Sequence, residues 1–147
     1  MENKKIVAFD YDGTLSIPSI EEYAKLLIEK GIEVWIVTSR YDSLEKYTPK
    51  YLRDLGMTIL EGKDEYNNLF VVAERLGIPE EHIVFTNMEL KWTYFINHPE
   101  FIWHLDDLWS EALEINERTK VKGIHWTGNT NWRVECSKLL WDNYEEN

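Results

Sequence analysis

Two aspartates, Asp10 and Asp12, follow the apolar run at residues 6–9 and precede Gly13 and Thr14. A buried parallel strand reads as a continuous apolar run, and ligands bind outside the carboxyl ends of such strands. Side chains two residues apart on a strand share a side, so we expect the two carboxylates to repel each other unless a cation or proton intervenes. Oxygen ligands without a nearby Cys or His set favour Mg²⁺ over zinc.

A second apolar run, at residues 32–37, ends in Thr38, Ser39 and Arg40. Taken alone, this ending favours a simple structural role, because short hydroxyl side chains cap helices well. Its place at the end of a predicted strand is what makes it a candidate for the same site.

Two further motifs follow along the chain. Lys91 begins a helical pattern, and the apolar run at residues 101–105 leads into Asp106 and Asp107. A lysine on a helix is usually only solvated, and an acidic pair after a strand is usually a turn. Four ordinary features in this order, each at the boundary of an element, are informative together.

In this order, the motifs resemble those of the haloacid dehalogenase (HAD) superfamily. The resemblance consists of Asp-x-Asp-Gly-Thr-Leu at residues 10–15, a strand ending in Thr or Ser, a helix-initial Lys and an acidic pair at a strand end. Most members are Mg²⁺-dependent phosphatases that act through an aspartyl phosphate. The resemblance extends over residues 5–107 by motif and over the rest of the chain by architecture.

The resemblance implies a role for each of four catalytic side chains. Asp10 would attack phosphorus, and Asp12 would protonate the leaving oxygen and then deprotonate water. Thr38 and Lys91 would hold the phosphoryl oxygens. Gly13, Thr14, Ser39 and Arg40 would complete the phosphate-binding set.

The same resemblance implies Mg²⁺ as the cofactor. Its expected ligands are the Asp10 side chain, the Asp12 backbone carbonyl and one member of the pair Asp106 and Asp107. We favour Asp107 as the direct ligand, with Asp106 as its support.

Composition restricts the partners of the chain. Its 147 residues, 44% of them hydrophobic, have the length of one domain, which we assign to residues 1–147. A net charge of −11 makes nucleic acid an unlikely partner, since Lys46, Lys50 and Arg53 form only a small basic patch. We find no apolar run that could span a bilayer and no signal peptide, so we expect no membrane partner and a cytoplasmic location.

Strands and helices alternate along the chain, which predicts an α/β fold with a central parallel sheet and helices on both faces. The resemblance implies the three-layer Rossmann-like form of this fold, as in the HAD superfamily. Ser19 is a good N-cap for the first helix. Pro49 either opens a later helix directly after Thr48 or kinks one that starts at Ser43.

The chain leaves little room for a separate cap domain over the site. Residues 14–31 hold one helix, and residues 41–90 are used by two helices and short strands. We therefore expect an open site unless a loop or a second copy in a homo-oligomer covers it. Trp92, Trp109 and residues 125–129 are candidates to line its mouth.

The function that follows is hydrolysis of a phosphate monoester on a small phosphorylated metabolite. Among such metabolites we favour nucleotide monophosphates as the substrate, and phosphorylated sugars as the second choice. A phosphotransferase would use the same residues. A dehalogenase is less favoured because it does not need Asp12, and a phospho-receiver signalling module is less favoured because Asp10 is both first and central.

Overall fold

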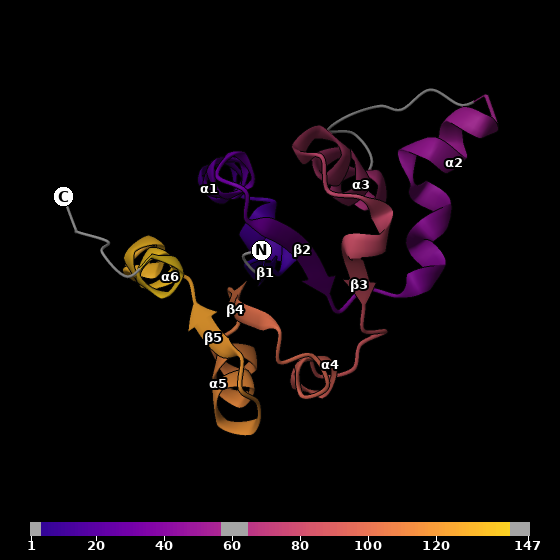
Figure 1. Cartoon of the computed structure of the whole chain (residues 1–147). Coiled ribbons are helices and arrows are strands. Elements are labelled where there is room, and N and C mark those ends of the chain that lie inside the picture. Colours follow the sequence, from indigo (N-terminus) through magenta and orange to yellow (C-terminus); the bar gives the residue numbers. More distant parts are fainter. Residues whose placement is uncertain (1–3, 57–64, 142–147) are drawn as a thin grey trace.

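The computed structural model describes residues 4–56 and 65–141, in which five parallel strands form a single sheet (Figure 1). The strands are β1 (Ile6–Phe9), β2 (Glu33–Thr38), β3 (Ile83–Phe85), β4 (Phe101–Asp106) and β5 (Lys122–His125). The predicted α/β class with a parallel sheet is confirmed.

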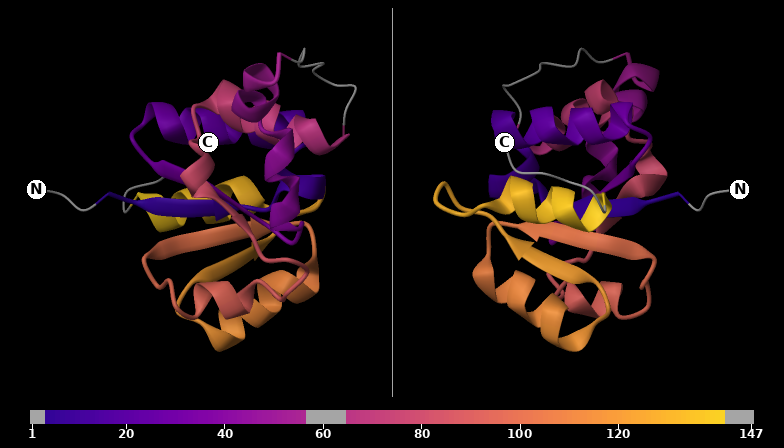
Figure 2. Two further views of the ribbon diagram at one scale, coloured as in Figure 1. Left: turned by 90° about the vertical axis from the view of Figure 1, so that its right-hand side faces the viewer. Right: turned by 60° about the vertical axis from the view of Figure 1, so that its left-hand side comes forward.

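Helices cover both faces of the sheet. They are α1 (Pro18–Glu29), α2 (Pro49–Asp54), α3 (Glu65–Leu76), α4 (Trp92–Phe95), α5 (Trp109–Arg118) and α6 (Trp132–Leu140). The two views of Figure 2 place α1, α3 and α6 on one side of the sheet and α4 and α5 on the other. Within the described residues, none of these helices has both the length and the apolar character needed to cross a bilayer.

Side chains alternate between the two faces of the sheet along each strand, so the strands contribute residues to two hydrophobic cores, one on each face. Phe9 and Trp103 belong to the core beneath α1, α3 and α6, and their rings meet edge to face at 5.3 Å. Ala8 and Phe95 belong to the smaller core beneath α4 and α5. Cys136 is fully buried in the first core, as expected of a small filler.

The strand order is β3-β2-β1-β4-β5, so β1 lies in the centre. The chain first builds outward from β1 through β2 to β3, and then returns to the other side of β1 to add β4 and β5. The order therefore reverses between β1 and β4, which is where open α/β sheets bind their ligands.

A β-bulge sets the register between these two strands. Ile6 pairs with Phe101, but Ala8 pairs with His104, so two residues of β4 stand opposite one residue of β1. The shift continues to Phe9, which pairs with Leu105. Asp106 consequently follows at the level of Asp10 instead of one step beyond it.

Two helix starts differ in how well the sequence indicated them. The expectation of Ser19 as an N-cap is wrong: α1 begins at Pro18, and Ile17 is its cap residue. Proline suits the first helical position because its fixed φ is helical and its missing N–H would be unpaired there. For α2 the first alternative is correct, since Thr48 caps the helix through a hydrogen bond from the Tyr51 N–H and Pro49 follows.

Candidate active site

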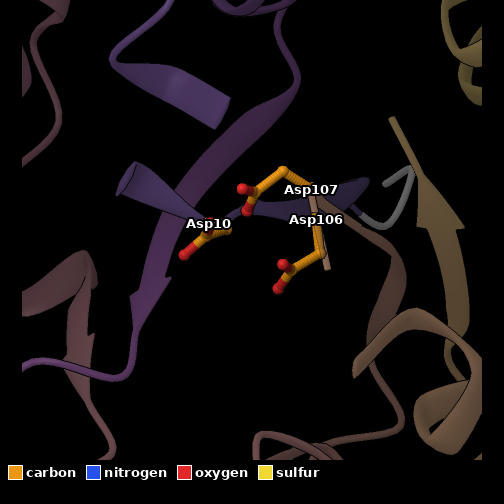
Figure 3. Close-up of side chains that lie close together, drawn as sticks. All are labelled: Asp10, Asp106 and Asp107. Carbon is orange, nitrogen blue, oxygen red and sulfur yellow. The ribbon is translucent and has the colours of Figure 1, made fainter. Parts of the chain in front are cut away.

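Three aspartates gather at the carboxyl ends of the two central strands (Figure 3). Asp10 directly follows β1, Asp106 ends β4, and Asp107 comes next. One carboxylate oxygen from each lies within 4.8 Å of the others. The cluster therefore stands at the point where the strand order reverses, and its two central members are buried.

Lys91, the residue before α4, joins this cluster. Its ammonium donates to Asp10 Oδ1 at 2.9 Å and to Asp106 Oδ2 at 2.6 Å, and only 2% of the residue is exposed. Burial alone would lower the pKa of Lys91, but the charges of the two aspartates outweigh it and raise this pKa. The lysine is therefore a fixed positive charge inside the site.

The Asp106 carboxylate accepts hydrogen bonds from three donors. Besides Lys91, His104 Nε2 lies 2.8 Å from its Oδ2 and the Leu108 N–H donates to its Oδ1 at 3.0 Å. Burial alone would raise the pKa of Asp106, but the bond from His104 and the charge of Lys91 outweigh it and hold this pKa below its usual range. Asp106 is thus an ionised support that holds Lys91.

His104 was not predicted as a site residue. It is fully buried in β4, and burial lowers its pKa, so the imidazole is neutral and donates its Nε2–H to Asp106. The sequence did hold a signal, because residues 104 and 106 share a side of the strand. His104 is the one polar residue in the otherwise apolar run at residues 101–105.

Asp10 is buried and disfavoured in its charged form, although Lys91 donates to it. Burial raises its pKa well above the usual range, the neighbouring Asp106 and Asp107 raise it further, and Lys91 only partly opposes them. Three carboxyl groups thus face one ammonium group, and Asp107 is only half-buried. An oxygen-preferring divalent cation fits this donor set, because it would relieve the repulsion that Lys91 leaves.

Asp12 lies apart from the other carboxylates, contrary to expectation. Strand β1 ends at Phe9, and residues 11–15 form a tight turn, so side-chain alternation does not extend to Asp12. Its carboxylate, 57% exposed, forms a two-point ion pair with Arg40, at 2.9 Å from Nε and 2.7 Å from Nη2. Arg40 also lies over the ring of Tyr11.

The remaining predicted residues surround this centre. Thr14 is buried, and its hydroxyl donates to Asp10 Oδ2 at 3.3 Å. Thr38 is buried at the end of β2, and its hydroxyl accepts the Arg40 N–H at 3.3 Å. Ser39 is half-buried and accepts the Met88 N–H at its backbone carbonyl.

Gly13 fits tightly against the acidic cluster. Its φ is +74°, and a Cβ atom there would stand 2.5 Å from Asp107 Oδ2. Only glycine meets both conditions without strain. The turn can therefore approach Asp107 because this position has no side chain.

The structure thus brings Asp10, Thr14, Lys91 and the acidic pair into contact, and it places Asp12 with Arg40 beside them. No family model, curated protein or solved structure matches this chain. The chemistry of the site must therefore be argued from its own geometry.

Proposed function

We propose that this chain is a Mg²⁺-dependent phosphomonoester hydrolase of the HAD type, acting through an aspartyl phosphate. The observation that carries the proposal is the cluster at the centre of the sheet, in which Asp10 is held by Lys91 beside Asp106 and Asp107. A carboxylate at a strand end next to a fixed ammonium and a cation site is suited to attack an anionic phosphate.

The metal would be held by the Asp10 side chain, the Asp12 backbone carbonyl and Asp107. Asp106 is the weaker candidate because Lys91, His104 and the Leu108 N–H already occupy its oxygens. When bound, Mg²⁺ would offset the charge of the carboxylates and of the phosphoryl oxygens.

The covalent step belongs to Asp10. One of its carboxylate oxygens forms a bond to phosphorus while the bond from phosphorus to the ester oxygen breaks. Asp12 donates a proton to that departing oxygen. In the second half of the proposed reaction, a water oxygen bonds to phosphorus, the bond between phosphorus and Asp10 breaks, and Asp12 accepts the proton from water.

Arg40 adds a condition to the role of Asp12. In this structure the guanidinium binds both carboxylate oxygens of Asp12. Asp12 must loosen one of these bonds before it can reach a leaving oxygen, and Arg40 can then bind the incoming phosphate, since a guanidinium suits two-point contact with phosphate oxygens. Thr38 and Lys91 supply further donors.

The substrate we propose is a small phosphate monoester, with nucleotide monophosphates first and sugar phosphates second. We further propose that the site has no separate cap domain, so that a second copy of the chain is the candidate cover. Hydrolysis is distinguished from transfer by the fate of the phosphoryl group, which appears as free phosphate or as the ester of an added alcohol.

The decisive experiment compares Asp10→Asn with the wild-type protein on an aryl phosphate and on a panel of monoesters, with Mg²⁺ present. We expect Asp10→Asn to lose at least about 10³-fold in rate, as removal of a nucleophile does. Asp54→Asn is the control, because Asp54 lies on α2, where it pairs with exposed Lys50.

Retention of more than about 1% of the rate by Asp10→Asn would identify another nucleophile. A wild-type protein that releases no phosphate but becomes labelled on Asp10 by acetyl phosphate would instead be a receiver-like module.

A further inference from the structure

Trp126 reaches across the sheet to the turn that follows β1. Its indole Nε1–H donates to the Gly13 carbonyl at 2.6 Å, between residues 113 positions apart. Its backbone N–H donates to the Asp106 carbonyl at 2.8 Å. One residue beyond β5 therefore bonds to both segments that carry the acidic cluster.

His125, the last residue of β5, reinforces this link. One of its ring nitrogens lies 3.2 Å from the carbonyl of Asp107. His125 and Trp126 together contact the backbone carbonyls of Gly13, Asp106 and Asp107. The end of β5 thus fixes the backbone around the site without adding a carboxylate to it.

Packing holds the indole in this position. The ring of Trp126 meets Trp132 edge to face at 6.0 Å, and Trp132 meets Tyr23 in the same way at 5.3 Å. The Tyr23 hydroxyl in turn shares a 2.8 Å hydrogen bond with Ser137, and both residues are buried. Trp126 is therefore braced by α6 and, through Trp132, by α1.

The turn that Trp126 contacts is also held from within and by a neighbour, since the Gly13 N–H donates to Ser16 Oγ at 3.1 Å and Asp12 pairs with Arg40. Within the turn, the carbonyls of Asp10, Tyr11 and Thr14 accept the N–H groups of residues 15, 16 and 17, respectively. The Gly13 carbonyl accepts the Trp126 indole N–H, which adds a bond from outside the turn at the residue whose backbone is least restricted by a side chain. The Asp12 carbonyl accepts none of these bonds, and it is the backbone ligand proposed for the metal.

We propose that Trp126 is a positioning residue that holds the 11–15 turn in the conformation that binds Mg²⁺, an inference that rests on the proposed function. Trp126 belongs to residues 125–129, which the sequence offers as candidates to line the mouth of the site. Its indole N–H donates to the Gly13 carbonyl, so the loss of this donor affects the turn and the metal site, whatever the leaving group of the substrate. Partners of this kind typically change metal affinity or activity by about 10- to 100-fold.

The test compares Trp126→Phe, which removes the donor and keeps a ring, with Trp132→Phe, which trims the packing and leaves the donor in place. Amide hydrogen exchange is measured first, without metal. In Trp126→Phe we expect the Leu15 and Ser16 amides, which bond to Asp10 and Tyr11, to exchange at least about tenfold faster, whereas the amides of β2 are unchanged. Trp132→Phe is expected to leave the Leu15 and Ser16 amides as in the wild type.

Mg²⁺ binding, followed by calorimetry, and turnover are measured next. The Mg²⁺ dissociation constant of Trp126→Phe is expected to rise by about 10- to 100-fold. Its kcat should fall by the same factor for an aryl phosphate and for a nucleotide monophosphate, with KM little changed. Unaltered exchange in Trp126→Phe, or a change confined to the KM of one substrate, would overturn the positioning role.

The exchange measurement needs neither metal nor turnover, so it separates the two proposals. Faster exchange at Leu15 and Ser16 in a protein that hydrolyses no phosphate would keep the role of Trp126 in shaping the turn and reject the function. If Trp126→Phe does not fold, β-(3-benzothienyl)alanine placed at position 126 by amber suppression replaces only the N–H by sulfur, and the same exchange result decides.

Discussion

The Lys91 ammonium separates two buried aspartates that would otherwise repel each other. It lies 2.9 Å from Asp10 and 2.6 Å from Asp106, with little access to water. In such a place the desolvation cost is high, and the removal of one partner leaves a buried charge without compensation. Lys91 thus bears on the stability of the fold as well as on the charge of the candidate site.

Replacing Lys91 by Met should lower the free energy of unfolding by about 3–5 kcal/mol in EDTA, measured by urea denaturation at pH 7. Lys50→Met is the matched control, because Lys50 pairs with Asp54 at the surface, where both side chains are more than half exposed. We expect the control to lose no more than about 1 kcal/mol. Equal losses in the two variants would show that the buried ion pairs are not stabilising.

At the scale of elements, the turn after β1 determines how close the acidic pair can come to Asp10. Its centre, Gly13, combines a left-handed backbone with direct contact to Asp107. Gly31 provides a comparison, since its φ is +87° and an added Cβ there meets nothing within 4 Å. The two glycines separate backbone strain from crowding of the site.

Gly13→Ala should abolish both Mg²⁺ binding and phosphatase activity, because the new methyl group would displace the Asp107 carboxylate. Gly31→Ala should lose about 1–2 kcal/mol of stability from the left-handed backbone and keep its activity. Calorimetric Mg²⁺ titration and thermal denaturation distinguish these results. A Gly13→Ala protein that binds Mg²⁺ as the wild type does would remove Asp107 from the proposed ligands.

At the scale of the whole molecule, the raised pKa of Asp10 links stability to pH and metal. A group with a raised pKa in the folded state contributes stability below its usual pKa, near 3.8, and loses it as the pH rises through the folded value. The metal-free protein is therefore weakened by this group towards neutral pH. Asp106 has a lowered pKa, so its contribution is lost only below about pH 4.

Mg²⁺ should consequently stabilise the protein more at pH 8 than at pH 5, since at low pH it competes with a proton on Asp10. At a concentration 100 times the dissociation constant, the gain is about 2.7 kcal/mol, or roughly 5–10 °C in Tm. Thermal scans in Mg²⁺ and in EDTA at the two pH values measure it. A Mg²⁺-induced rise in Tm that is equal at pH 5 and pH 8, or that persists unchanged in Asp10→Asn, would contradict this linkage between metal binding and pH.

The surface charge of the molecule bears on its partners. In the small basic patch, Lys50 pairs with Asp54 and Arg53 pairs with Glu74, while the side chain of Lys46 lies outside the described residues. Two of its cations are thus already engaged by carboxylates. This agrees with the proposal that the partner is a small phosphate ester and not a nucleic acid.

Much of the fold followed from local pattern, because apolar runs and periodic stripes depend on neighbouring residues. The meeting of Asp10 and Asp106 was predictable, since parallel strands bring their carboxyl ends to one edge, whereas Lys91, which precedes α4, was expected in the site only from the resemblance. The hydrogen-bond and ion-pair partners around the site could not be predicted in this way. The pairing of Asp12 with Arg40 depends on where β1 stops, and the bond from Trp126 to Gly13 joins segments 113 positions apart.

The register of β4 against β1 could not be predicted from the sequence either. Nothing in residues 101–106 marks the extra residue opposite β1, yet without it Asp10 would lie level with Leu105. A local pattern can locate a strand, but the alignment of two strands depends on packing that involves both cores.

The central position of β1 has a consequence for the order of synthesis. Its first neighbour, β2, begins at residue 33, but its second neighbour, β4, begins only at residue 101. At about 5–20 residues per second, a ribosome needs roughly 5–20 s to pass from Asp10 to Asp106. During that time one edge of the central strand β1 remains unpaired, as on any open sheet edge. A nascent chain that ends before Phe101 therefore carries Asp10 but lacks the acidic pair that completes the cluster.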